Sequence, residues 1–293
     1  MIAIITGATG DIGEEFVKAL LGEGDRIWAV GRSEEKLNAL KEKYGEKIVP
    51  VRADLSDTGE VMGLCRLIEG EKPEVRYLVN NAGVAKMAPV ADFSLAEISR
   101  TLAVNDTAAA LLCRACIPCM QKGGHILNVA SASAFQPNPY IALYAASKSF
   151  LLSFTRSLNV ELPDVQCTAV CPGWVDTQML PGRSDGKARY PGMVSPEEVV
   201  KAALRDSKKG KDVSVCSPLF RYLRLYSKLM PHRLVMKQWV RMIRKHLCKE
   251  PPSLRPGASL YALYRAQRST AAITVPTIMR EKLSFHLPPR SKP

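Results

Sequence analysis

Short apolar runs alternate with amphipathic segments along the first 217 residues. The runs expected to be strands are IAIIT (2–6), RIWAVG (26–31), IVPVRAD (48–54), RYLVNNAG (76–83), HILNVAS (125–131), VQCTAVCPG (165–173) and DVSVCS (212–217). Helical patterns are expected at 12–24, 33–45, 57–70, 94–121, 143–161 and 195–207, with Ser33 and Ser195 as N-caps. Apolar rather than alternating strands predict an α/β fold, a doubly wound parallel sheet with helices on both faces.

The pattern changes after Ser217. Residues 219–230 and 232–247 are expected to form two basic amphipathic helices joined at Pro231. On the second helix Arg233, Lys237, Arg241 and Arg244 share one face, and Val235, Trp239, Met242 and Ile243 share the other. The chain is therefore divided into a domain at 1–217, a basic helical extension at 218–250 and a tail at 251–293, which is expected to be poorly ordered.

The formal net charge of +13 lies almost entirely in the last third of the chain. Residues 1–207 hold 22 Lys/Arg and 25 Asp/Glu, whereas residues 208–293 hold 19 and 3. We expect the helical extension to cover a substrate site with its basic side in solvent. Peripheral attachment to anionic lipid is the alternative. Nucleic acid is not expected as a partner, because no known binding module is visible.

The remaining composition gives no sign of export or of a metal. The first residues lack the basic segment of a signal peptide, and no apolar stretch approaches the roughly 20 residues of a membrane-spanning helix. The eight cysteines are scattered, which favours reduced thiols and a cytoplasmic location. Cys113, Cys116 and Cys119 lack the fourth ligand of an iron–sulfur motif, so we expect them to pack as small apolar residues, and no metal is expected.

The segment T6-G-A-T-G-D-I-G13 stands between the first strand and the first helix. Gly7 permits a tight turn, and Gly10 and Gly13 permit close backbone approach and close helix packing. The helix N-terminus then offers free N–H groups to a pyrophosphate. A turn that binds no ligand has the same glycines, but the position at the first strand–helix junction favours a dinucleotide.

Arg32 follows the second strand, where a carboxylate would bind the ribose diol of NAD. A guanidinium instead suits a 2′-phosphate, because it is planar, always charged and able to bind bidentately. The sequence therefore predicts that NADP(H) is preferred over NAD(H).

Tyr144 and Lys148 are four residues apart, one turn along a predicted helix. A tyrosine with an ordinary pKa near 10 is a poor proton donor to an alkoxide, and a nearby ammonium lowers that pKa. The hydroxyl of Ser131 can hold a substrate carbonyl oxygen. Taken alone, the pair is common, and a core tyrosine with a surface lysine is the favoured interpretation; the nucleotide motif upstream favours the catalytic one instead.

Six ordered motifs in residues 1–217 together resemble the short-chain dehydrogenase/reductase family. They are the glycine motif, N80-N-A-G83, Asn105 in A103-V-N-D, Ser131 thirteen residues before Tyr144, Y144-x-x-x-K148 and the run PGWVDT from Pro172 to Thr177. The resemblance implies a Rossmann fold and transfer of a hydride between NAD(P) and a carbonyl or alcohol carbon. It also implies a homodimer or homotetramer, paired through the helices expected at 94–121 and 143–161.

The resemblance also assigns roles to single residues. Tyr144 would be the general acid or base, Lys148 would lower its pKa and bind the nicotinamide ribose, Ser131 would orient the substrate, and Asn105 would hold a water. The expected cofactor-binding residues are Gly7, Thr9, Gly10, Asp11, Ile12, Gly13, Arg32, Asp54, Leu55, Asn81, Ala82, Gly83, Tyr144, Lys148, Pro172, Gly173, Val175 and Thr177. The apolar Phe135 and Trp174, with Gln136, are expected in a pocket for a lipophilic ketone, of ketosteroid or 3-oxoacyl type.

One position departs from the family's standard glycine motif. Its middle glycine falls at Asp11, whose charge would repel a diphosphate unless the side chain turns outward or caps the helix. Two alternatives to an enzyme stay open on the sequence: a non-catalytic nucleotide sensor, and a membrane-surface protein of the same fold.

Overall fold

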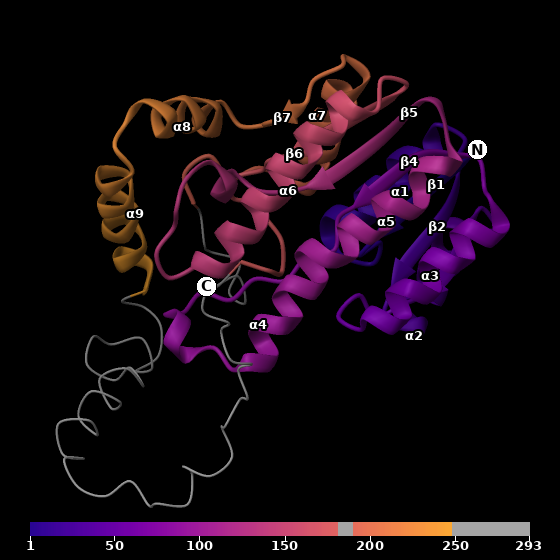
Figure 1. Ribbon diagram of the computed structural model, residues 1–293, viewed down its shortest axis with the longest axis horizontal. Coiled ribbons are helices and arrows are strands. Elements are labelled where there is room, and N and C mark those ends of the chain that lie inside the picture. The colour runs from indigo at the N-terminus through magenta and orange to yellow at the C-terminus, as the bar shows by residue number, and fades with distance from the viewer. Residues whose placement is uncertain (181–189, 248–293) are drawn as a thin grey trace, which may run out of the picture. The chain divides into compact units, whose positions relative to one another are not determined.

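The computed structural model describes residues 1–180 and 190–247, which belong to one compact unit. Its strands form a single parallel sheet of seven strands in the order β3-β2-β1-β4-β5-β6-β7 (Figure 1). Their bounds are β1 (Ile2–Thr6), β2 (Arg26–Gly31), β3 (Ile48–Arg52), β4 (Val75–Asn80), β5 (Met120–Val129), β6 (Val165–Val170) and β7 (Val213–Ser214). The predicted doubly wound α/β fold is therefore confirmed.

Helices cover both faces of the sheet because each apolar strand needs a partner on either side. On one face lie α1 (Asp11–Gly22), α2 (Glu34–Tyr44) and α7 (Pro196–Lys208), which contribute Phe16, Leu37 and Val199 to one apolar cluster. On the other lie α3 (Thr58–Glu71), α5 (Ala108–Cys116) and α6 (Ala142–Glu161), which contribute Leu64, Leu112 and Leu158 to a second cluster. The side chains of Ser33 and Ser195 cap α2 and α7, as predicted.

The helix expected over 94–121 is divided in the structure. It consists of α4 (Leu95–Leu102), a π-helical turn (Ala103–Thr107), α5 and a 3-10 turn (Ile117–Cys119). The chain is already in β5 at Met120, which pairs with Val75 of β4, so the predicted helix end was wrong by two residues. The predicted strand 212–217 is also shorter, because β7 pairs only with Ala169 and Val170 before the chain turns toward the next helix.

By length and composition the continuous stretch Leu95–Cys119 is apolar enough to cross a membrane, with a mean hydropathy of 1.3. Its inner face is buried in the core, where Leu112, Cys113 and Cys116 are fully covered. This position indicates a core helix of the sheet rather than a membrane span. The two cysteines pack as small apolar residues, as the sequence predicted.

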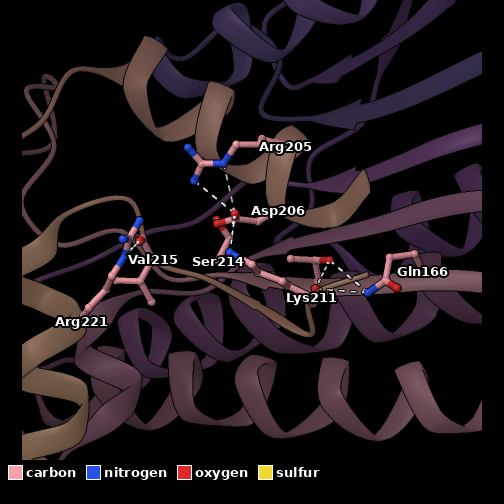
Figure 2. Close-up of polar contacts among 8 residues, drawn as sticks. Gln166, Arg205, Asp206, Lys211, Ser214, Val215 and Arg221 are labelled. Carbon is pink, nitrogen blue, oxygen red and sulfur yellow. Dashed lines mark hydrogen bonds and ion pairs between the residues drawn. The ribbon is translucent and has the colours of Figure 1, made fainter. Parts of the chain in front are cut away.

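Two further helices follow the sheet, α8 (Pro218–Leu229) and α9 (His232–Leu247), where the sequence places them. Figure 2 shows the polar contacts around the edge strand β7 from which α8 departs. The buried Asp206 carboxylate accepts hydrogen bonds from Lys211 and from the Ser214 hydroxyl, at 2.9 and 2.8 Å. Arg221 of α8 donates to the carbonyl of Val215 at 2.7 Å, which anchors α8 to this edge. The predicted tail at 251–293 lies outside the described residues.

Candidate active site

The residues singled out in the sequence gather at the carboxyl ends of the strands. The chain winds outward from β1 through β2 to β3, then returns to the other side of β1 with β4. The point between β1 and β4 is the topological switch, where doubly wound sheets bind their ligands. The glycine loop follows β1 at this point, and Asn81–Gly83 follow β4.

Two glycines of the loop are required by the fold itself. Gly7 has a φ of 62°, in the left-handed region that favours glycine. A Cβ on Gly13 would lie 2.0 Å from the carbonyl oxygen of Gly7, so α1 packs on the loop at a distance that only glycine allows. Gly10 differs, because a Cβ there would meet its nearest atom at an ordinary 3.5 Å. Protein packing therefore gives no reason for glycine at position 10.

Thr6 holds the loop to the end of β4, a role that the sequence reasoning missed. Its hydroxyl oxygen accepts hydrogen bonds from the backbone N–H groups of Asn81 and Ala82, at 3.0 and 3.1 Å. The Asn81 side chain donates in turn to the carbonyls of Thr6 and Gly7. The available signal was a polar residue that ends an otherwise apolar strand directly before the glycine motif.

Asp11 is the first residue of α1, and the N-cap position belongs to Gly10. Its carboxylate accepts a hydrogen bond from the backbone N–H of Gln178 at 2.8 Å. The side chain therefore turns toward the segment that follows β6. Asp11 joins the nucleotide loop to a segment 167 residues further along the chain.

Arg32 and Asp54 stand at neighbouring strand ends. Arg32 is exposed directly after β2, and Thr9 lies close to Gly31 across the loop. Asp54 accepts hydrogen bonds from the backbone N–H and hydroxyl of Ser56, which lower the pKa of its carboxyl group, and the charge of Arg32 lowers it further. Leu55 beside them is buried. This corner thus offers the exposed guanidinium of Arg32 within electrostatic reach of an anchored carboxylate, on which the exposed Arg100 also acts.

Ser131, Tyr144 and Lys148 are brought together by β5 and α6. Ser131 follows β5 and is buried, and its side chain engages the Tyr144 hydroxyl. The Lys148 ammonium is 3% exposed, donates to the carbonyl of Val129 at 2.8 Å and lies 5.6 Å from the centre of the Tyr144 ring. The helical spacing of four residues therefore places both side chains at the end of β5.

The pKa of Tyr144 differs from the sequence expectation. Burial raises the pKa of this phenol above its ordinary value of 10, and the hydrogen bond with Ser131 offsets only part of that effect. Burial also lowers the pKa of Lys148 to about 8, with the charge of Asp106 acting in the opposite direction. The expected lowering of the Tyr144 pKa by Lys148 is therefore not seen. Burial removes water from both groups, and this is the largest contribution to the pKa shift of each.

Asn105 is fully buried in the π-helical turn, a feature that is frequent at functional sites. Its amide oxygen accepts from the N–H of Val84 at 2.8 Å, and its amide nitrogen donates to the carbonyl of Val84 and to the Ser147 hydroxyl, both at 3.0 Å. A Cβ on Gly83 would lie 3.3 Å from the Lys148 nitrogen and 3.5 Å from the Asn105 amide oxygen. Glycine thus keeps the space between these two side chains open.

Asp106 is a second residue that the sequence reasoning missed. One of its carboxyl oxygens is buried without a hydrogen-bond partner in the part of the chain that the structure describes. Burial raises the pKa of this carboxyl group from 3.8 to about 6, although Lys148 counteracts the rise. Asp106 ends the motif A103-V-N-D, but its raised pKa arises from burial, which the motif does not express.

We expect Asp106→Asn to stabilise the protein at neutral pH. A carboxyl group whose pKa is raised by folding contributes stability that is complete below the unfolded pKa and is lost as the pH rises through about 6. Because the side chain is only partly buried, solvent screening reduces the expected gain to about 1 kcal/mol near neutral pH. Urea unfolding of both proteins at neutral pH measures the difference in their free energies of unfolding. Below pH ~4 we expect no difference. Equal stability of both proteins at neutral pH would contradict the argument.

The segment after β6 covers the other side of the site. The carbonyl of Pro172 accepts from the N–H of Ala132, and the Thr177 hydroxyl donates to the carbonyl of Val175, which is buried. A Cβ on Gly173 would overlap the Phe220 ring of α8, so this glycine allows the helix to approach. The residues predicted to contact the nicotinamide end therefore also hold α8.

The predicted pocket residues separate into two groups. Trp174 packs in the same apolar cluster as Tyr144, with Ile141 and two residues of α9, Trp239 and Ile243. Phe135 instead packs against a separate apolar cluster, with residues from α5, α6, β6 and β7, and the guanidinium of Arg224 lies above its ring. Gln136, next to it, is half-buried.

Helix α9 reaches the site through Trp239. The indole N–H donates to the carbonyl of Pro139 at 2.8 Å, five residues before Tyr144, and the ring stacks on Trp174. The exposed Arg233, Lys237 and Arg241 lie on the opposite face, as the sequence predicted. An apolar wall contributed by α9 thus stands beside the tyrosine.

Comparison with known proteins gives one family. A family model described as short chain dehydrogenase matches residues 1–188. Among curated proteins, the 2-(R)-hydroxypropyl-CoM dehydrogenase of Xanthobacter autotrophicus is 32% identical over 195 residues, which are 63% of this chain and 78% of that protein.

Solved structures share the fold. A short chain dehydrogenase of Burkholderia cenocepacia in complex with NADP has a TM-score of 0.68 and 26% identity, over 81% of this chain and 96% of the other. A short chain dehydrogenase/reductase of Burkholderia phymatum in complex with NAD has a TM-score of 0.67 over 76% and 91% of the two chains. At 22% identity the second comparison supports the fold alone.

Proposed function

The chain belongs to the short-chain dehydrogenase/reductase family of NAD(P)-dependent oxidoreductases, and on that premise we propose that it reduces a lipophilic ketone with NADPH, or oxidises the alcohol with NADP. The observation that carries the proposal is the convergence of Ser131, Tyr144 and Lys148 at the end of β5, beside the space left by Gly83. This set serves proton transfer to a carbonyl oxygen.

The residues at the switch point fit a dinucleotide. The glycine loop and the start of α1 offer backbone N–H groups to a pyrophosphate, and Gly10 leaves room for close approach. Lys148, buried and bound to the main chain, is placed to bind a ribose hydroxyl. The nicotinamide, when bound, supplies or accepts the hydride.

The protein's own part is to move a proton and to exclude water. In reduction, the Tyr144 hydroxyl donates its proton to the substrate oxygen, and in oxidation the phenolate removes that proton. Burial raises the pKa of Tyr144, which keeps the phenol protonated at neutral pH but makes it a weaker acid than a solvent-exposed tyrosine. Ser131 orients the same oxygen, while Trp174 and Trp239 shield the site from solvent.

Preference for NADP(H) is supported by the exposed Arg32 at the end of β2. A guanidinium at this corner is free to form a bidentate contact with a 2′-phosphate. The carboxylate of the neighbouring Asp54 already accepts two hydrogen bonds from Ser56.

We expect Arg32→Ala to raise the Kd for NADPH by roughly 10- to 100-fold. This is the effect of losing one charge-assisted hydrogen bond between the guanidinium and the 2′-phosphate. The Kd for NADH should change little, because NADH lacks the 2′-phosphate. Fluorescence titration of each reduced cofactor measures both values. Arg26→Ala is the matched control, since Arg26 is an exposed arginine at the opposite end of the same strand. Equal weakening of NADPH and NADH by Arg32→Ala would contradict the assignment.

The lipophilic character of the substrate is inferred from the walls beside Tyr144. Ile141, Trp174, Trp239 and Ile243 form an apolar cluster there, with Met87 and Tyr140 packed on it. An apolar wall contributes affinity in proportion to the apolar area that a ligand buries. Ketones with a large hydrocarbon body, such as ketosteroids and 3-oxoacyl thioesters, suit it better than small polar ones.

The deciding experiment is oxidation of NADPH, followed by absorbance, with ketones from small diketones to ketosteroids and 3-oxoacyl thioesters. We expect kcat/KM to rise with the apolar area of the ketone. Turnover confined to small polar ketones would overturn the substrate class but leave the reaction intact. Tight NADPH binding with no turnover on any ketone would favour a nucleotide sensor instead.

Pairing of two copies is a separate proposal, supported by apolar side chains left exposed on α4 and α6. Leu95 is 87% exposed, and the stacked pair Phe150 and Phe154 lies on α6, with Phe150 42% exposed. Such side chains are typical of a homodimer face. Sedimentation equilibrium of the full chain tests it.

A further inference from the structure

Helix α8 carries apolar side chains on the side that faces away from the fold. Leu219, Tyr222, Leu225 and Leu229 are 38%, 63%, 58% and 74% exposed. At about 100° per residue they form one stripe along the helix. The opposite side is occupied by Phe220, Leu223 and Ser227, which are partly or fully buried. The helix is thus apolar on two sides, and the fold covers only one of them.

Basic side chains are exposed on both helices. Arg221 and Lys228 are exposed on α8, and Arg233, Lys237 and Arg241 are exposed on α9. The sequence from Val213 to Lys249 contains no aspartate or glutamate, so this surface has no acidic counter-charge of its own. We call the stripe and these five cations the α8–α9 surface.

Helix α8 follows β7, and α9 turns back toward the residues around Tyr144 (Figure 1). Arg221 bonds to Val215, the Phe220 ring packs on Gly173, and Trp239 bonds to Pro139. The Phe220 and Trp239 contacts come from the inner sides of the two helices, whereas Arg221 is exposed and bonds back to the edge of the sheet. The exposed leucines are therefore presented by a fixed scaffold and do not belong to the cluster beside Tyr144.

The positive charge of the α8–α9 surface distinguishes among the partners that could cover it. A second copy meeting the same face would bring the cations of both copies together, which costs free energy. Residues 250–293 of this chain hold seven Lys/Arg and two Asp/Glu, so they are no better matched. Nucleic acid would satisfy the cations but leave the leucines exposed to water.

We propose that the α8–α9 surface lies on an anionic lipid bilayer, with the leucine stripe between the headgroups and the cations among the phosphates. An apolar stripe flanked by basic residues is the pattern of helices that lie in a membrane interface. Each Lys or Arg near an anionic leaflet adds to the attraction. A membrane would also be the source of the lipophilic substrate that the proposed function requires, although the surface is argued independently of it.

The test is co-sedimentation of the full chain with vesicles of phosphatidylcholine alone or mixed with phosphatidylglycerol, at low and high salt. We expect binding to the mixed vesicles at low salt and weak binding to the neutral ones. The double variant Leu225→Glu with Leu229→Glu should raise the apparent Kd at least tenfold. Val160→Glu is the matched control, because Val160 is an 83% exposed apolar residue on α6, and it should bind like the wild type.

The affinity of each variant for NADPH, measured in the absence of lipid, shows that its fold is kept. Equal sedimentation of the wild type and the double variant would overturn the proposal. A second contrary result would be that the protein does not bind vesicles and that the double variant converts a dimer to a monomer. That result would assign the leucine stripe to contact with a second copy. Binding to duplex DNA but not to the mixed vesicles would overturn the proposal as well.

Discussion

Replacing Tyr144 by phenylalanine is expected to lower kcat about 10³-fold, within the range that a general acid contributes. The substitution removes only the hydroxyl group, so the ring keeps its place in the cluster with Trp174 and Trp239. Binding of NADPH should change less than threefold, because Lys148 retains its bond to the carbonyl of Val129. The measurement is steady-state reduction of the best ketone, beside titration of NADPH.

Tyr140→Phe is the matched control, since Tyr140 packs on the same cluster and loses the same atom. We expect its kcat to remain near that of the wild type. If both variants lost activity equally, the effect would belong to the cluster rather than to proton transfer. If Tyr144→Phe remained fully active, the proposed acid would be wrong, whatever the cofactor affinity.

Gly13→Ala is expected to destabilise the protein by about 3 kcal/mol, the upper part of the range for overpacking. The added Cβ would lie 2.0 Å from the carbonyl oxygen of Gly7, which is a backbone atom and cannot rotate away. Helix α1 must therefore move off the loop, and the affinity for NADPH should fall with it. Urea unfolding and NADPH titration measure the two effects.

Gly10→Ala separates packing from cofactor approach. Its Cβ would find only an ordinary contact at 3.5 Å, and its φ of −93° suits alanine. We expect stability within about 0.5 kcal/mol of the wild type, as for substitutions away from special features. Affinity for NADPH should still fall, because the methyl group occupies the space left for the pyrophosphate. Unchanged affinity would show that Gly10 does not face the cofactor.

Much of this architecture was predictable because its signals are local. Apolar runs and N-caps such as Ser33 and Ser195 act within a few residues, so the pattern of the sequence identifies them. The spacing of Tyr144 and Lys148 is likewise a property of one helix. The glycine motif marked the switch point because the turn itself demands Gly7.

The remaining features depend on contacts between distant segments. The hydroxyl of Thr6 binds residues more than 70 positions away, and Asp11 binds Gln178. The raised pKa values of Tyr144 and Asp106 arise from burial, which no motif expresses. The position of Phe135 under Arg224 likewise depends on how α8 returns to the sheet.

The order of the strands also has a consequence for synthesis of the chain. The first strand to leave the ribosome, β1, lies inside the sheet between β2 and β4, and β2 and β3 complete only one side of it. The edge of β1 that pairs with β4 stays unpaired until β4 is made, and β4 begins 23 residues after β3 ends. At roughly 5–20 residues per second, the nascent chain carries an unpaired apolar edge for about 1–5 s. Such an edge can pair with other chains, so expression at lower temperature or with a chaperone should raise the soluble yield.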